Sequence, residues 1–191
     1  MSTQTAIALP AWALQQINDL DAADQRAKEL AEPLTLEQLN WQPGPAAWSI
    51  GQCIDHLRLT NEVYLAPIMA AMEGKSPSAI EKITPGWPSR WFIRNFIAPS
   101  PNAKRAPAPK KIVPVSRVDL SILNQFLSTN QTVREFVHRA STYDVNRIRF
   151  KNPFVSGVRF TVGTGLLIIC NHQRRHLLQA ERVRQSLNFP K

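Results

Sequence analysis

Cysteine is scarce in this chain, which has only Cys53 and Cys170 among its 191 residues. Two cysteines make no disulfide framework, so we expect a reducing compartment. The first five residues, MSTQT, lack the basic start and apolar run of a signal peptide. The longest nearly unbroken apolar run, Leu166–Cys170, is far too short to span a bilayer. The sequence therefore predicts a soluble, cytoplasmic protein without a membrane-spanning segment.

Several motifs of well-known enzymes are also missing. The seven glycines form no phosphate-binding loop, and there is no G-x-S-x-G nucleophile elbow. The chain has no internal repeat, which argues against a repeat architecture. Acidic residues are few, with 14 Asp and Glu against 23 Lys and Arg, so the formal net charge is +9. This excess could attract nucleic acid, anionic lipid or acidic substrates, but it describes the surface potential rather than a function.

The remaining composition is ordinary for a soluble globular protein, with 43% hydrophobic and 19% charged residues. A chain of 191 residues is long enough to bury a full hydrophobic core. We therefore expect a single domain that covers residues 1–191.

Helical periodicity dominates the chain. Apolar residues recur at helical intervals in four long segments, and the loops between them differ greatly in length. Thr35, Ser49 and Ser116 are suited to cap helices. The predicted class is all-α, a four-helix bundle with at least one crossover. The expected long helices are 10–32, 49–73, 116–141 and 161–187, and the last of them starts at Thr161 or Thr164. A short helix is expected at 35–39. Residues 143–160 are expected to form a loop.

The connection between the second and third long helices, residues 75–114, is long, basic and rich in proline. Connections of this length are usually functional or disordered. Its aromatic residues predict that it packs back onto the body, with a short helix at 91–97. Tryptophan and arginine in alternation could stack on nucleic-acid bases. A loop that covers a groove explains them equally well, and we do not expect nucleic-acid binding. The basic residues are Lys75, Lys82, Arg90, Arg94, Lys104, Arg105, Lys110 and Lys111.

The last predicted helix carries an H-x-x-x-H pair, His172 and His176. Residues four apart share a helix face, so both rings can reach one ion. Two imidazoles at this spacing suit zinc or nickel. Two solvated or packed histidines are the alternative. Gln173 replaces the glutamate of the H-E-x-x-H motif, which excludes a zincin. Gln179 lies near the helix face that carries His172 and His176, and it could line a pocket or support a metal ligand.

His56 lies about two turns into the second predicted helix. By itself it is compatible with a partly buried histidine bonded to a neighbour, or with a further ligand. Cys53 lies one turn earlier and could be a ligand or a small buried thiol in the core. His138 lies among charged residues and is expected at the surface.

Three segments together resemble the DinB superfamily. They are LTLEQLNWQP at 34–43, WSIGQCIDHL at 48–57 and HQRRHLLQ at 172–179. The resemblance implies an up-down-down-up four-helix bundle with a metal at one end. It implies that His56, His172 and His176 bind one divalent ion, commonly zinc or nickel. It also implies a homodimer.

The same resemblance implies a small-molecule reaction. Some relatives are metal-dependent transferases or isomerases that use low-molecular-weight thiols, and others are described as hydrolases. Hydrolysis requires a general base, but no acidic residue lies on the face of the last helix that carries His172 and His176. Glu181 is on another face. Thiol transfer requires less from the protein, so we favour a thiol-dependent S-transferase over a hydrolase. The competing class is a non-catalytic stress-response or binding protein that uses its basic surface.

Two structural expectations complete the analysis. We expect the bundle to bury Trp12, Trp41 or Trp48 near the start of the second helix, where Trp41 and Trp48 flank a Pro-Gly turn. We expect a dimer through helix faces, because the third helix has more apolar positions than one stripe requires. Those positions are Leu120, Leu123, Phe126, Leu127, Val133, Phe136 and Val137.

Overall fold

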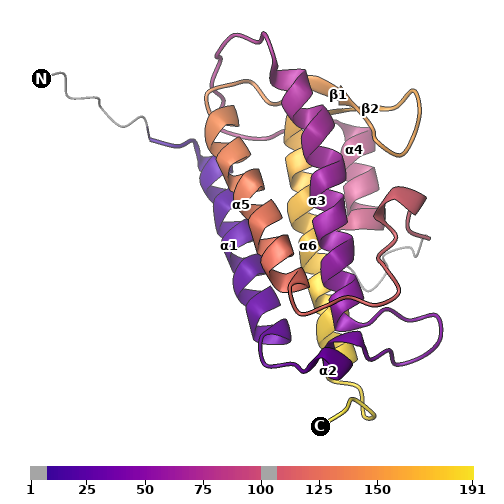
Figure 1. Ribbon diagram of the computed structural model, residues 1–191. Helices are drawn as coiled ribbons and strands as arrows, with labels where there is room; N and C mark the ends of the chain where they lie inside the picture. The colour runs from indigo at the N-terminus through magenta and orange to yellow at the C-terminus, as the bar shows by residue number, and fades with distance from the viewer. Residues whose placement is uncertain (1–7, 100–106) are drawn as a thin grey trace, which may run out of the picture.

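Four long helices lie side by side and hold most of the chain (Figure 1). The computed structural model describes residues 8–99 and 107–191. The long helices are α1 (Ala11–Ala31), α3 (Ile50–Met72), α5 (Ile122–Ala140) and α6 (Val162–Arg184). The prediction of a mostly helical protein is confirmed.

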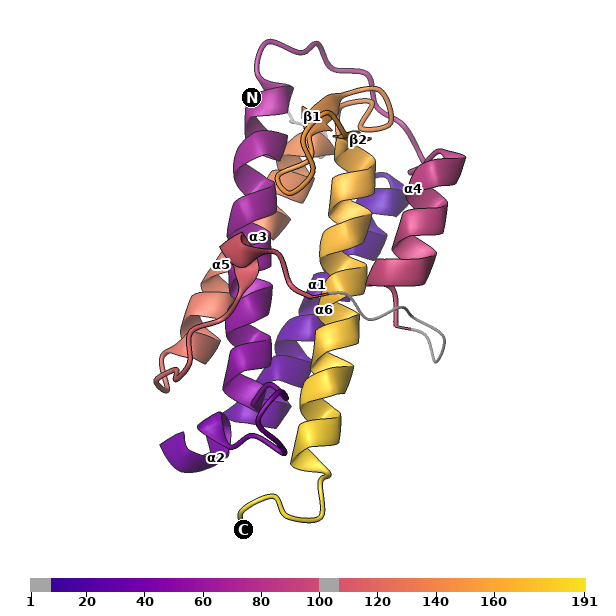
Figure 2. The ribbon, with the colours of Figure 1, turned by 90° about the vertical axis from the view of Figure 1, so that its right-hand side faces the viewer.

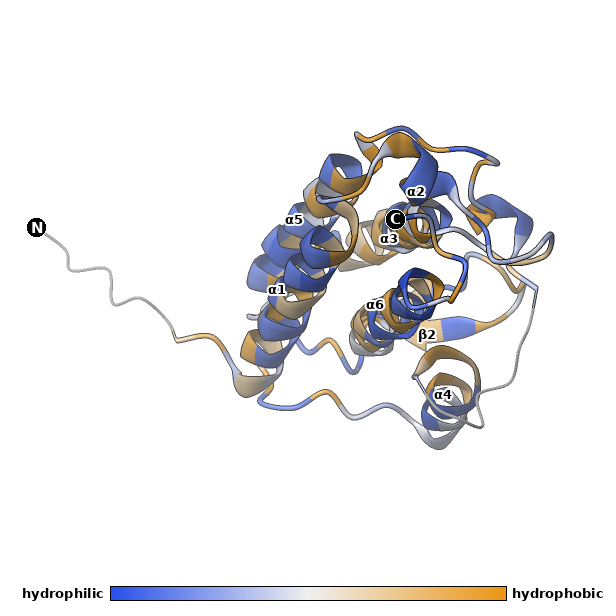
Figure 3. Ribbon diagram, turned by 90° about the horizontal axis from the view of Figure 1, so that it is seen from below, coloured by the Kyte–Doolittle hydropathy of each residue, from blue (hydrophilic) through white to orange (hydrophobic). Residues whose placement is uncertain are grey.

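In Figure 1, α1 and α6 run towards the end where α2 (Leu36–Asn40) lies, and α3 and α5 run away from it. Each of α1 and α3 packs against both α5 and α6. Viewed from below, hydrophobic residues on these helices turn towards the interior and hydrophilic residues turn outwards (Figure 3). In the described ranges no helix is both long enough and apolar enough to cross a membrane.

Side-chain caps begin α2 and α3 as predicted. Thr35 and Gln38 form a capping box at the start of α2. Ser49 and Gln52 form another at the start of α3. Each box satisfies two backbone N–H groups that have no partner within the helix. The local sequence therefore fixes where α3 begins. It thereby also fixes the position along the bundle of every residue that follows on this helix.

The predicted start of the third long helix at Ser116 is wrong, because α5 begins at Ile122. The residues before it form an irregular segment that is hydrogen-bonded to α3. Gln52 donates to the carbonyl oxygen of Val115 at 3.1 Å, and the backbone N–H of Val115 donates to Asp55 at 3.0 Å. These tertiary bonds outweigh the local helical preference. The fourth helix also ends earlier than predicted, at Arg184 instead of Leu187.

A small hairpin replaces part of the loop expected at 143–160. Strands β1 (Arg149–Lys151) and β2 (Arg159–Thr161) pair antiparallel, with Phe150 opposite Phe160. Only the middle residue of each strand is buried. Each strand alternates over only three residues, which is too short for the pattern to predict a strand from the sequence.

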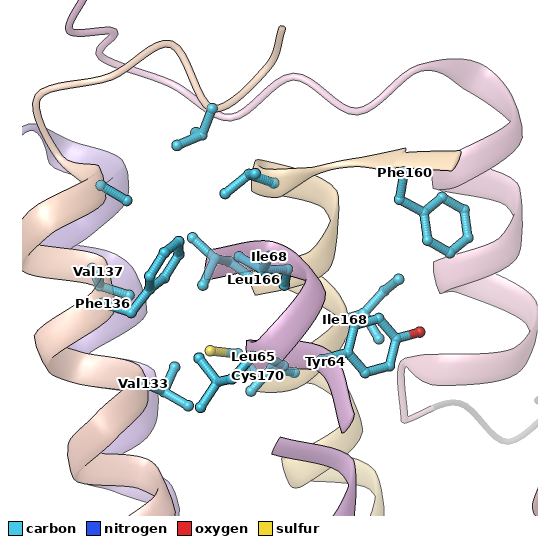
Figure 4. Close-up of a cluster of buried hydrophobic side chains, with 14 of the residues drawn as sticks. Tyr64, Leu65, Ile68, Val133, Phe136, Val137, Phe160, Leu166, Ile168 and Cys170 are labelled. Carbon is cyan, nitrogen blue, oxygen red and sulfur yellow. The ribbon is translucent and has the colours of Figure 1, made fainter. Parts of the chain in front are cut away.

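The core forms two clusters, one towards each end of the bundle. The cluster nearer the hairpin includes Tyr64, Ile68, Phe136 and Leu166 (Figure 4). Trp12 is buried in this cluster, far along the bundle from the start of α3. The other cluster surrounds the start of α3, where Trp41 and Trp48 are half-buried against it. Trp41 and Trp48 therefore pack near the start of α3 as predicted, whereas Trp12 is buried elsewhere.

The described part of the 75–114 connection packs back onto the body through Phe92, Phe96 and Ile97, whereas its two tryptophans, Trp87 and Trp91, are exposed. It contains α4 (Trp87–Phe92), a π-helical turn η1 (Ile93–Ile97) and a 3₁₀ turn η2 (Lys110–Ile112). The helix expected at 91–97 thus begins four residues earlier and ends in the π turn. Figure 2 shows α4 beside α6, and η2 lying over α3. The predicted basic residues Lys104 and Arg105 fall outside the described residues.

Candidate metal centre

The fold brings His56, His172 and His176 together. His56 comes from α3, and the other two come from adjacent turns of α6. One ring nitrogen from each histidine lies within 4.8 Å of the other two, so the three could hold a metal ion. All three come from the packed α3–α6 pair. His56 and His172 are buried, and His176 is half-buried.

A backbone carbonyl fixes the orientation of His56. Nδ1 of His56 lies 2.6 Å from the carbonyl oxygen of Ile112 in η2. A carbonyl oxygen can only accept, so Nδ1 carries the proton and the neutral ring leaves Nε2 bare. That Nε2 lies 3.3 Å from Nε2 of His172. The ring therefore presents its lone pair to the centre of the cluster.

The side chain of Gln179 does the same for His176. Its carbonyl oxygen Oε1 accepts a hydrogen bond of 2.9 Å from Nδ1 of His176. The Nε2 atom of His176 is then left with the lone pair. Gln179, which the sequence suggested as a pocket residue or a support for a ligand, therefore contacts one of the three histidines. Nδ1 of His172 is buried without a hydrogen-bond partner in the described residues.

Burial keeps these rings uncharged. It lowers the pKa of His172 well below the ordinary value, and the neighbouring histidines and Arg175 lower it further. Burial, with His56 and Arg175, lowers the pKa of His176 to about 3, and the hydrogen bond that His176 donates to Gln179 acts in the opposite direction. Burial also lowers the pKa of His56, although the Ile112 carbonyl acts in the opposite direction. Neutral imidazole is the form that binds metals, so the cluster is ready to do so near neutral pH.

The spacing of one pair of nitrogens matches that expected around a bound ion, and all three lie within 4.8 Å of one another. Zinc–nitrogen bonds of about 2.0–2.1 Å at a tetrahedral angle place two nitrogens roughly 3.3–3.4 Å apart. The two Nε2 atoms of His56 and His172 are 3.3 Å apart. Three neutral histidines leave further positions open to water or substrate, as in catalytic rather than structural zinc sites.

A cavity of about 250 Å³ opens beside the histidines. Its wall is largely apolar and comes from α3, α6, the 75–114 connection and the hairpin loop. Within the described ranges no Asp or Glu lines it. The lining includes the three histidines with Thr60, Tyr64, Phe92, Phe96, Ile97, Ile112, Asn152, Phe154, Ile168 and Arg175. The connection between α3 and α5 therefore forms part of the wall of the site.

Sequence reasoning missed three contributors. The Ile112 carbonyl could not be found, because any residue has one. Trp48 lies against the site, with its ring 4.7 Å from that of His56 and 5.7 Å from that of His176. Arg175 lines the cavity. Its position three residues after His172, on the same side of the helix, was the signal that could have found it.

The structure separates the remaining candidates from the cluster. Cys53 is buried in the core around the start of α3 and does not line the cavity. Burial raises the pKa of its thiol to about 12, which opposes the thiolate form that binds metal. Of the two alternatives for Cys53, a metal ligand or a small buried thiol in the core, the structure supports the second. His138 is exposed near the end of α5.

Comparison with known proteins agrees with the sequence resemblance. No curated protein and no solved structure matched the chain. The sequence pattern of the DinB superfamily matches residues 19–180, which include α3, α5 and all three histidines. The chain belongs to the DinB superfamily.

Proposed function

We propose that this chain is a metal-dependent enzyme of small-molecule chemistry on an up-down-down-up four-helix bundle. One divalent transition metal, zinc or nickel, binds through Nε2 of His56, His172 and His176. The observation that carries the proposal is the convergence of three neutral, buried or half-buried imidazoles on one point beside an apolar cavity. Such an ion supplies Lewis acidity, which lowers the pKa of a bound thiol or water.

Thiol transfer is the reaction that we favour. The cavity has no carboxylate among the described residues that could serve as a general base for water. A thiol needs no such base once its thiolate is stabilised. In the transfer, sulfur attacks an electrophilic carbon and the S–C bond forms as the bond to the leaving group breaks. The leaving group departs with its electron pair, and the thiol proton goes to solvent.

The protein's own residues orient the metal-binding rings and exclude water from the cavity. Ile112 and Gln179 hold two of the three rings in the tautomer that turns Nε2 to the centre. Phe92, Phe96 and Phe154 exclude water from the reacting groups. A low-molecular-weight thiol is the co-substrate in this proposal.

We also propose that the chain acts in the cytoplasm as a homodimer. Family resemblance is the support for the dimer. The apolar residues of α5 that suggested a dimer are mostly packed inside the chain itself, since Leu123, Phe126 and Phe136 are buried. Leu120 is exposed but lies before α5. Sedimentation at micromolar concentration tests the dimer, and a monomer contradicts it.

The test of function compares metal-free and metal-reloaded protein. Untagged protein is stripped with a chelator, reloaded with zinc or nickel, and assayed with several biological thiols and a fluorogenic bimane electrophile. We expect turnover that requires both the metal and a thiol. Metal-dependent cleavage of esters or amides without a thiol would favour a hydrolase. Salt-sensitive binding of DNA with no turnover would favour the non-catalytic alternative.

A further inference from the structure

Tyr64 is the one tyrosine in the described wall of the cavity. It lies on α3 about two helical turns past His56, with Thr60 between them, and all three residues line the cavity. Its ring meets those of Phe150 and Phe154 edge-on, at centroid distances of 6.1 and 5.6 Å. Two aromatic neighbours therefore fix the ring in a position from which its polar end can reach a ligand.

The hydroxyl of Tyr64 is a donor without an acceptor. The residue is 2% exposed, and its hydroxyl has no hydrogen-bond partner within the described ranges. Figure 4 shows this hydroxyl turned away from Val133, Phe136 and Val137 of α5. Burial raises the pKa of Tyr64, so the phenol keeps its proton near neutral pH. A buried donor without a partner costs free energy, and a ligand with an acceptor atom in the cavity would recover it.

The other uncharged polar groups of the described wall are less suited to give a proton. Thr60 donates its hydroxyl hydrogen to a backbone carbonyl of α3 at 2.8 Å, so only its lone pairs remain. The side-chain oxygen of Asn152 accepts from the backbone N–H groups of Phe154 and Val155 at 2.8 and 3.0 Å. Its amide nitrogen can donate a hydrogen bond, but an amide does not release a proton near neutral pH. Tyr64 is therefore the neutral proton donor of this wall.

The proposed transfer needs a proton donor when the leaving atom is oxygen. An alkoxide leaves poorly unless it is protonated, whereas a halide leaves without a proton. An epoxide is neutral and compact, and its single acceptor oxygen is also its leaving group. A cavity of about 250 Å³ walled by Phe92, Phe154 and Ile168 suits such a ligand with an apolar or aromatic substituent.

We propose that Tyr64 donates its hydroxyl proton to the ring oxygen of a small apolar epoxide, which is the substrate class of this site. The inference rests on the proposed thiol transfer. Sulfur attacks one ring carbon, and the S–C bond forms as the C–O bond breaks. The electron pair of that bond goes to the oxygen, which takes the proton of Tyr64. Solvent, which receives the thiol proton, returns one to Tyr64, and the product is a β-hydroxy thioether.

The experiment compares two aromatic electrophiles that differ in their leaving group, styrene oxide and benzyl chloride. Zinc-loaded protein is assayed with glutathione, cysteine and 2-mercaptoethanol as thiols. Tyr64→Phe should lower kcat/KM for styrene oxide by about a hundredfold or more, and that for benzyl chloride by less than about threefold. Tyr143→Phe is the matched control, because Tyr143 is the other of the two tyrosines and does not line the cavity. It should change neither value.

Binding is measured separately on metal-free protein, where no zinc competes for the ligand. Acetophenone and ethylbenzene are similar in size but differ by one acceptor oxygen. By calorimetry we expect acetophenone to bind about fivefold more tightly or better, because ethylbenzene leaves the Tyr64 hydroxyl without a partner. Tyr64→Phe should remove this preference, and Tyr143→Phe should keep it.

Three results would overturn the role of Tyr64. One is a Tyr64→Phe variant that loses activity equally with both electrophiles, since a structural defect does not distinguish leaving groups. Another is equal binding of acetophenone and ethylbenzene to the unmodified protein, and the third is a preference that survives Tyr64→Phe. Thiol-dependent turnover of benzyl chloride without that of styrene oxide refutes the epoxide alone. If neither electrophile is turned over in a metal- and thiol-dependent reaction, the proposed function itself is refuted.

Discussion

Nδ1 of His56 lies 2.6 Å from the carbonyl oxygen of Ile112, although the two residues are far apart in the sequence. The segment that carries this carbonyl is held along α3 by other bonds from the same helix face. Gln52 and Asp55 bind the backbone at Val115. Three side chains of α3 thus hold one length of chain, and that chain sets the tautomer of His56.

Replacing Asp55 should therefore weaken both folding and metal binding. Its buried carboxylate accepts from the backbone N–H of Val115 at 3.0 Å and from Arg58. Asp55→Ala leaves that N–H without its partner, so we expect a loss of about 1–3 kcal/mol in the free energy of unfolding. Zinc affinity should fall about tenfold as the Ile112 carbonyl loses its position. Denaturant unfolding and zinc titration measure the two effects.

Glu62→Ala is the control for Asp55. Glu62 is the other partner of Arg58 but is nearly half exposed and has no bond to the 107–118 segment. An exposed pair contributes little, so stability should change by less than about 1 kcal/mol and zinc affinity should not change. If the two variants lose zinc affinity equally, Asp55 does not position the site.

A buried amide cluster joins the helices beside the site. Asn61 of α3, Asn130 of α5 and Gln173 of α6 bond to one another, and Asn130 donates to Asp24 of α1. Gln173 donates to Oδ1 of Asn130 at 2.7 Å and directly follows His172. The cluster therefore fixes the depth of all four long helices, including the two that carry the histidines.

Asn130→Ala should destabilise the protein by about 2–3 kcal/mol, because the buried amides of Asn61 and Gln173 each lose one of their hydrogen bonds and Asp24 loses its donor. The neighbouring Gln131 is itself exposed and bonds to Glu135 and Arg134 at the surface, so Gln131→Ala should have almost no effect. Chemical denaturation of the two variants gives the comparison. Similar unfolding midpoints for both would refute a structural role for the cluster.

The metal-free protein should lose stability as the pH falls below about 6.5. In the folded state the pKa values of His56, His172 and His176 are lowered, that of His176 to about 3. In the unfolded chain they return to about 6.5. Below that pH the unfolded state binds more protons, so the free energy of unfolding falls, by up to roughly 1.4 kcal/mol per pH unit for each group. The contribution of His176 is complete above pH 6.5 and is lost progressively down to about pH 3.

Denaturant unfolding of chelator-treated protein between pH 7 and pH 4.5 measures this dependence. His176→Phe removes one of the titrating groups and should give a shallower slope. A stability that does not change between pH 7 and pH 5 would show that the histidines are not buried as neutral rings.

The sequence predicted the parts of the molecule that rest on local patterns. The caps at Thr35 and Ser49, the long helices and the His172–His176 pair follow from spacing and side-chain type. His56 as a third ligand was implied only by the resemblance to the DinB superfamily, and the structure brings it to the pair. The start of α5 could not be predicted, because Ser116 is a suitable cap that tertiary bonds from Gln52 and Asp55 override. The role of the Ile112 carbonyl depends on where a long connection returns, which no local pattern records.

Zinc titration of the metal-free protein tests the central claim most directly. We expect one zinc ion per chain, and a loss of about a hundredfold or more in affinity when His56, His172 or His176 is replaced by alanine. His138→Ala should bind zinc like the unmodified protein, because His138 is exposed and lies outside the cluster. Zinc binding that survives His176→Ala unchanged, or that is absent from the unmodified protein, would contradict the three-histidine metal centre.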